Sequence, residues 1–280
     1  MIAPEYEVFW RSARYKECKD ILEPQIKDMD KGPFYKHVML CDSYAKLKEY
    51  NKLFPCLDAL QERMDRGDNT MVLSWDWGIN ATLLRAEAYL ELGQYNKTIE
   101  YAKQAYDTIL NKKLHRAQKI RALSVYGLAC SLAGKRDRAY KIAKTVDSVD
   151  LGGSYSLGKP IKKEALAKIY FSLKDYSQAA EISSRFELDP MTYVTKTIAG
   201  HSNFYYMVLP LRFIKYKSLL EIGEIDEAKK GYDELLKREE ITGVGGIYWQ
   251  LLFDRGRIHK KERNNFKAIS FYKRAIDIIE

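Results

Sequence analysis

The residue types that most often carry out chemistry are scattered along this chain of 280 residues rather than grouped. None of the four histidines, His37, His115, His201 and His259, has a cysteine or carboxylate at the spacing of a metal-binding or nucleophile motif. Acid–base catalysis, covalent catalysis and metal binding all require such neighbours. The sequence therefore predicts no catalytic residue, no metal site and no cofactor, and hence a protein that is not an enzyme.

One stretch matches a phosphate-binding motif in part. The residues from Gly153 to Lys159 fit the pattern G-x-x-x-x-G-K, but Pro160 follows where the motif needs a hydroxyl group to hold magnesium. Proline is common at the first position of a helix, which is a better explanation of Pro160. We therefore do not predict a nucleotide site here.

The cysteines and the N-terminus favour a cytoplasmic protein. Cys18, Cys41, Cys56 and Cys130 show no paired spacing, so we expect reduced thiols packed in the interior. The first ten residues, MIAPEYEVFW, lack the basic start and apolar middle of a secretory signal. No apolar run is long enough to span a membrane, and we expect no membrane partner.

Positive charge is concentrated in one part of the chain. Between Lys112 and Lys144 there are ten basic residues and a single acid, Asp137, and this excess equals the formal net charge of the whole chain, +9. The basic patch predicted here consists of Lys112, Lys113, Arg116, Lys119, Arg136 and Arg138. It is either a solvated helix face or a surface for an acidic protein segment or nucleic acid.

The elements that must position these residues are helices. From Thr82 to Leu110 apolar residues recur at steps of three and four, which predicts two amphipathic helices. Gly93 marks the break between them, because a helix C-terminus favours a residue that tolerates positive φ. Tyr95 follows, where it can pack between the two helices.

The same pattern recurs along the chain, each time centred on one residue at the turn. The seven turn residues are Tyr15, Tyr50, Tyr95, Arg136, Tyr176, Ile225 and Phe266. Such a series of hairpins predicts one solenoid domain covering residues 1–280. The expected hairpins cover residues 3–29, 34–63, 79–110, 119–149, 161–186, 209–238 and 248–280.

This pattern resembles the tetratricopeptide repeat (TPR), which pairs a small residue in the first helix with an alanine early in the second. The small first-helix residues are Cys41, Ala86, Gly127, Ala167 and Gly256, and the alanines are Ala139, Ala179, Ala228 and Ala268. Tyr216 and Arg136 depart from the pattern, so we expect looser packing in their hairpins. The resemblance implies an all-α, right-handed α-solenoid of about seven hairpins.

In TPR proteins the first helices line a concave face that binds partner peptides or helices, so the resemblance implies a non-catalytic interaction scaffold. The matching positions here are Asp42, Leu83, Glu87, Arg121, Ser124, Leu128, Lys168, Phe213, Lys217, Phe253, Arg257 and Lys260. Their mixture of basic and apolar residues predicts an acidic partner segment with apolar anchors. Alternatively, the chain's own segment from Met191 to Val208 fills part of this face.

The last 34 residues, 247–280, are also similar to the repeat that often precedes a CHAT domain, a caspase-like peptidase module of bacterial signalling proteins. That resemblance implies a second possible function, the regulatory region of a larger bacterial protein. The last helix carries an apolar side that includes Ile276 and Ile279 and has no capping glycine. We therefore expect either that the native chain continues beyond Glu280 or that this apolar side contacts another chain. A nucleic-acid-binding solenoid is the third possibility.

Overall fold

The computed structural model describes residues 5–11, 14–26, 28–68, 71–72, 75–112, 116–151, 158–184, 201–237 and 245–279. Within these ranges the chain forms fourteen helices and one two-stranded sheet. The N-terminal helices are α1 (Glu5–Arg11), α2 (Tyr15–Gln25), α3 (Phe34–Lys46), α4 (Tyr50–Asp65), α5 (Trp77–Glu91), α6 (Tyr95–Lys112) and α7 (Arg116–Leu132). The remaining helices are α8 (Arg136–Asp147), α9 (Gly158–Ser172), α10 (Tyr176–Ser184), α12 (His201–Ile222), α13 (Ile225–Leu236), α14 (Gly245–Lys261) and α15 (Asn265–Ile279).

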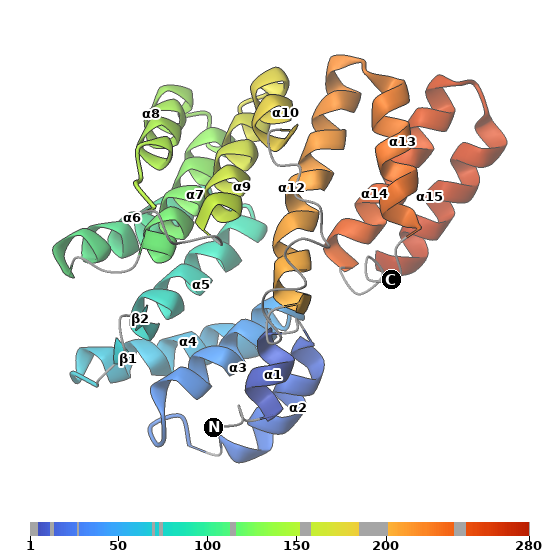
Figure 1. Cartoon of the computed structure of the whole chain (residues 1–280). Coiled ribbons are helices and arrows are strands. Elements are labelled where there is room, and N and C mark those ends of the chain that lie inside the picture. Colours follow the sequence, from blue (N-terminus) through green and yellow to red (C-terminus); the bar gives the residue numbers. More distant parts are fainter. Residues whose placement is uncertain are drawn as a thin grey trace.

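The helices are arranged in antiparallel pairs that follow one another in a curved row, from the blue N-terminal pair to the red C-terminal pair (Figure 1). The second helix of each pair also packs against the first helix of the next pair. From α3 onward the first helices contact one another in succession: α3 with α5, then α7, α9, α12 and α14. The predicted all-α, right-handed solenoid is confirmed.

The turns between paired helices have one repeated geometry. In six of the pairs the residue two positions before the second helix has a positive φ. Glycine occupies it at Gly93, Gly134 and Gly223, whereas Lys48, Lys174 and Arg263 occupy it in the other three. In each turn the following amide donates a hydrogen bond back to a carbonyl of the first helix, as from Gln94 to Tyr89 at 2.8 Å. This left-handed cap explains the glycine predicted at position 93.

Small residues at the helix crossings are buried as predicted. Cys41, Ala86 and Ala167 are fully buried in the first helices, and Ala139, Ala179 and Ala228 in the second helices. At Gly256 an added Cβ would lie 2.4 Å from the ring of Tyr272, which shows how closely α14 and α15 approach. Each pair buries its apolar faces against the neighbouring pairs, so hydrophobic burial stabilises the row along its whole length.

The prediction of loose packing around Tyr216 is wrong. The ring of Tyr216 lies against the backbone of Gly231 on α13, where a Cβ atom would come within 2.1 Å of the ring. The large and small residues have exchanged helices in this pair, so the two surfaces remain complementary. Tyr216 also lies 6.2 Å from the fully buried ring of Tyr232.

Replacing Gly231 by alanine should therefore destabilise the protein. Overpacking costs about 1–3 kcal/mol, and the better helix propensity of alanine returns up to about 1 kcal/mol, so we expect a net loss of about 1–2 kcal/mol. Denaturant unfolding measures this loss. In a Tyr216→Ala background the same Gly231→Ala change should be neutral or stabilising, and an equal cost in both backgrounds would contradict this packing.

Two of the four cysteines form a disulfide. Cys41 on α3 and Cys56 on α4 are joined across the hairpin with their Cα atoms 6.1 Å apart, whereas Cys18 and Cys130 are free and buried. The prediction of four reduced thiols is therefore wrong for one pair. The turn of a helical hairpin brings residues fifteen apart face to face, a spacing that resembles no short cysteine motif. Cysteine usage thus no longer supports a reducing compartment.

Thiol titration tests this pairing. Unfolded, non-reduced protein should react with two equivalents of a thiol reagent, from Cys18 and Cys130, and reduced protein with four. Because the bond closes a fifteen-residue loop, its reduction should lower the free energy of unfolding by about 3 kcal/mol. Four reactive thiols before reduction would contradict the pairing.

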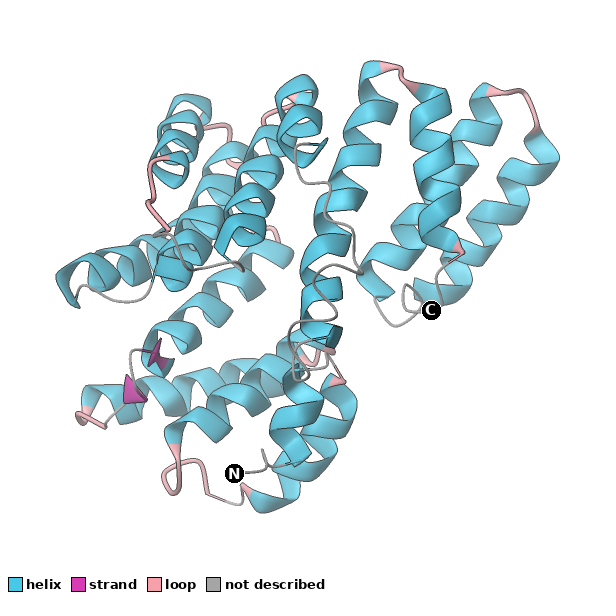
Figure 2. Ribbon diagram, viewed as in Figure 1, coloured by secondary structure: helices cyan, strands magenta, loops and turns pink. Residues whose placement is uncertain are grey.

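The segment between α4 and α5 contains the sheet, drawn in magenta in Figure 2. β1 (Met71–Val72) and β2 (Trp75–Asp76) are antiparallel, with Val72 opposite Trp75. Trp77 begins α5 and packs its ring 6.0 Å from Tyr35 on α3. Trp77 therefore fills the seam between two hairpins.

Candidate partner-binding face

The predicted binding residues lie on the first helices α3, α5, α7, α9, α12 and α14, and we call the surface that these helices form the inner face. Arg121 on α7 donates hydrogen bonds to both carboxylate oxygens of Glu87 on α5, at 2.7 and 2.8 Å. A third bond, 3.4 Å long, reaches Asn80. This two-pronged ion pair joins neighbouring hairpins across the inner face.

The field of this ion pair extends over four helices. Burial alone would raise the pKa of Glu87, but Arg121, then Lys46 and Lys168, outweigh it and lower the pKa to about 2. Partial desolvation would lower the pKa of Lys46, yet the charges of Asp42 and Glu87 outweigh it and raise the pKa. The structure therefore brings together predicted residues of α3, α5, α7 and α9: Asp42, Glu87, Arg121 and Lys168. It adds Lys46, which lies one turn beyond Asp42 and was not predicted.

Removing the carboxylate of Glu87 should destabilise the protein and change its dependence on pH. In the folded chain the pKa is below its usual value of 4.5, so the stabilisation is present above pH 4.5 and is lost as the pH falls toward 2. We expect Glu87→Gln to cost about 2–3 kcal/mol at pH 7 and to flatten the stability profile in that window.

The control for this prediction is Asp107→Asn, which breaks an exposed pair with Lys103 on a single helix. Such a pair contributes little, so the free energy of unfolding should hardly change. Urea unfolding at several pH values measures both variants. Equal behaviour of the two variants would contradict a structural role for the Glu87–Arg121 pair.

A second group of predicted residues surrounds Lys217 on α12. Its ammonium lies 5.2 Å from the ring centre of Phe213 and 5.5 Å from that of Phe171 on α9. It donates a hydrogen bond of 3.1 Å to the amide oxygen of Gln250 on α14. In the described part of the chain no carboxylate lies within 4.0 Å of it. Lys217 is thus a half-buried cation held by two rings and a neutral amide.

Two other predicted cations of the inner face, Arg257 and Lys168, are neutralised by the chain itself. Arg257 pairs with Glu221 at 2.8 Å and with Asp254 at 3.1 Å. Lys168 pairs with Glu164, one turn away on the same helix, at 2.5 Å. Near the end of α14, Lys260 is exposed, as is Phe253, whose ring lies 5.3 Å from Tyr272.

Several predicted contact residues face the interior instead. Leu83 is fully buried among Ile79, Ala105 and Ile109, so the prediction that it contacts a partner is wrong. The reason is that α6 and α7 cover that side of α5. Phe213 and Asp42 are also buried, at 7% and 8% exposure, and Ser124 and Leu128 are half-buried. These residues therefore support the inner face from below and expose little surface to a partner.

The described residues of the basic patch predicted from the sequence lie in different environments and do not form one surface. Lys112 pairs with the buried Asp76 at 2.9 Å, and Arg116 lies 3.9 Å from Asp150. Arg136 and Arg138 are exposed on α8, where the Arg138 guanidinium lies 5.0 Å from the ring centre of Tyr126. Lys119 is half-buried, and Lys113 lies outside the described residues. Among the described residues of the patch, only Arg136 and Arg138 are therefore both exposed and without a carboxylate within 4.0 Å.

The apolar residues of the last helix are partly exposed and partly buried. Phe266, Ile269, Ile276 and Ile279 of α15 are exposed, whereas Ala268 and Ala275 are buried on the helix, which packs against α14. Of the segment from Met191 to Val208, predicted as a possible cover of the face, residues 191–200 lie outside the described ranges and His201 begins α12.

Two further features bear on function. Among the described residues, no group of three or more histidine, cysteine, aspartate or glutamate side chains is placed to hold a metal ion. No helix in the described ranges is both long and apolar enough to cross a membrane.

Solved structures with a similar fold are tetratricopeptide-type proteins. A tetratricopeptide repeat protein from Parabacteroides merdae ATCC 43184 is 14% identical with a TM-score of 0.57, covering 97% of this chain and 92% of that one. The apo form of the quorum sensor NprR from B. thuringiensis is 11% identical with a TM-score of 0.52, covering 98% and 87%. No family model and no curated protein matches the sequence.

These likenesses extend over nearly the whole chain and show that it has the fold of a tetratricopeptide-repeat solenoid. At such low identity they show the fold alone. The resemblance of the last repeat to those that precede CHAT domains stays a prediction.

Proposed function

We propose that this protein is a non-catalytic interaction module that binds an extended segment of a partner protein along its inner face. The observation that carries the proposal is the state of Lys217. The described residues place no carboxylate within 4.0 Å of this half-buried ammonium, and its desolvation costs energy that a neutral amide offsets only in part. A carboxylate of a bound partner would supply the missing charge.

The surroundings of Lys217 define the rest of the partner's chemistry. Phe171 and Phe213 hold the ammonium in place, so little side-chain entropy is lost when an anion binds. Phe253 follows Gln250 by about one turn of α14, and its exposed ring offers an apolar contact there. The partner segment that fits carries an acidic residue with an apolar residue close by.

The two clusters of the inner face then have different tasks. The Glu87–Arg121 pair is closed, because each oxygen of the carboxylate already accepts a hydrogen bond from the guanidinium. It fixes the distance between hairpins, and Lys217 remains to receive the ligand. One similar structure is a quorum sensor, and a regulatory role is in keeping with this proposal.

Peptides selected from a random library for binding to the wild-type protein should carry aspartate or glutamate beside leucine, isoleucine or phenylalanine. Lys217→Met should weaken their binding at least about tenfold, as expected for loss of a charge-assisted hydrogen bond. The matched control is Lys215→Met on the same helix, because Lys215 already pairs with Glu227 at 3.4 Å. Fluorescence anisotropy gives the affinities.

A result in which Lys217→Met binds the selected peptides as tightly as Lys215→Met would contradict the proposed anchor. Circular dichroism of both variants guards against a trivial loss through unfolding. If no peptide can be selected at all, binding of an extended segment is itself wrong.

The two alternatives from the sequence have less support. The exposed cations of α8 would suit phosphate groups, but Lys112 and Arg121 of the same sequence run are engaged by Asp76 and Glu87. A regulatory region of a larger CHAT-containing protein is compatible with the same inner-face binding. In that case binding at the inner face would regulate an attached CHAT domain, and Lys217 would still be the anchor for the partner segment.

A further inference from the structure

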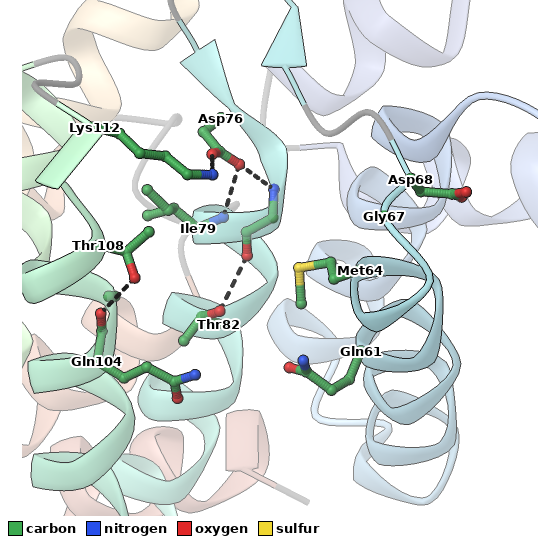
Figure 3. A pocket seen from close by; sticks show the side chains of 12 residues that line it. Gln61, Met64, Gly67, Asp68, Asp76, Ile79, Thr82, Gln104, Thr108 and Lys112 are labelled. Carbon is green, nitrogen blue, oxygen red and sulfur yellow. Dashed lines mark hydrogen bonds and ion pairs between the residues drawn. The ribbon is translucent and has the colours of Figure 1, made fainter.

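A cleft of about 330 Å³ lies between α4 and α6, away from the inner-face clusters, with the first turn of α5 behind it (Figure 3). Ligand pockets span about 300–1,000 Å³, so this volume suits a small group rather than a large one. In Figure 3 Met64 projects from α4 toward the side chain of Thr82 on α5. Ile79 supplies further apolar lining.

One end of the cleft contains a buried carboxylate. Asp76 is only 1% exposed, and one of its oxygens accepts hydrogen bonds from the amides of Gly78 and Ile79, at 2.8 and 3.3 Å. It thereby caps the N-terminus of α5. The other oxygen accepts from the ammonium of Lys112 at 2.9 Å. Lys112 is the last residue of α6, and its side chain is 51% exposed.

The hydroxyl groups along the cleft act as acceptors. Thr82 donates to the carbonyl of Gly78 at 3.1 Å, and Thr108 donates to that of Gln104 at 2.9 Å. Both protons are thus directed into the threonines' own helices, and the oxygens are left to accept hydrogen bonds from a ligand. Together with Asp76, the cleft offers acceptors and negative charge, while Lys112 is the one cation among the described residues that line it. A ligand that matches must donate hydrogen bonds and carry positive charge.

We propose that this cleft is a binding site for an ammonium or guanidinium group on an aliphatic stem, and that Lys112 occupies it in the free protein. The stem packs against Met64 and Ile79, and the charged group takes the place of the Lys112 ammonium at Asp76. Lys112 can leave because its long stem is flexible and half in solvent. The group belongs either to a small amine or guanidine or to a lysine or arginine side chain of a protein segment.

Removing the internal competitor tests the proposal. Lys112→Ala should bind n-butylguanidinium at least about tenfold more tightly than the wild type, a difference that corresponds to one charge-assisted hydrogen bond. A heteronuclear NMR titration measures the affinity and should shift the amide signals of Gly78, Thr82 and Thr108. Lys103→Ala, which removes a lysine of α6 that pairs with Asp107, is the matched control and should behave as the wild type does.

Two further variants in the Lys112→Ala background locate the site. Asp76→Asn keeps the oxygen that caps α5 but loses the charge, and Thr82→Val with Thr108→Val removes the acceptors; each should weaken binding at least about tenfold. Butyrate, which has the same stem with the opposite charge, should not bind. Retained binding in the Asp76→Asn variant, equal affinity of Lys112→Ala and Lys103→Ala, or binding of butyrate would overturn the proposal.

A second titration distinguishes the two sources of the ligand. Capped alanine peptides with one central arginine or lysine represent a protein segment, and n-butylguanidinium and n-butylamine represent small molecules. Tighter binding of the peptides assigns the cleft to a protein partner, and tighter binding of the small molecules assigns it to a metabolite-sized amine. Binding of neither class to Lys112→Ala would overturn the site.

Discussion

Close approach between helices is the constraint on which the rest of this structure depends. Each pair can pack only where one helix offers a side chain no larger than cysteine to the bulk of the other, as Gly256 does to Tyr272. Where the first helix carries Tyr216 instead, the second helix supplies Gly231. The requirement therefore concerns the sum of two volumes rather than a particular residue at a particular position. The same spacing brings the inner-face side chains of neighbouring pairs within hydrogen-bonding distance.

That spacing determines which charges are used up and which remain. Arg121 and Arg257 each find carboxylates on their own or a neighbouring first helix, whereas Lys217 finds two aromatic rings and an amide. Lys112 belongs to the same basic run of the sequence as Arg121, but it pairs with Asp76 at the start of α5. Net charge thus says little about the inner face, because Arg121 and Arg257 are already paired with carboxylates. Lys217, for which the described residues supply no carboxylate within 4.0 Å, indicates where a ligand can act.

Much of the fold could be predicted because its signals are local. The turn residues and the small residues at the crossings repeat at regular intervals, and the second helices do begin at Tyr15, Tyr50 and Tyr95. What could not be predicted depends on contacts between distant residues. The burial of Leu83 is decided by α6 and α7, and the Cys41–Cys56 bond by the geometry of a hairpin. The two rings around Lys217 come from different helices, and of these two residues only Phe213 was predicted, not Phe171.

The links across the inner face also differ in how they are built. Between α5 and α7 two parallel hydrogen bonds from one guanidinium form a short, fixed connection. Between α12 and α14 the links come from two separate side chains, one from Arg257 to Glu221 and one from Lys217 to Gln250. A ligand carboxylate at Lys217 would therefore compete with a neutral amide and leave the Arg257–Glu221 pair in place. Binding would loosen one of the two connections between these helices while the other keeps them in register.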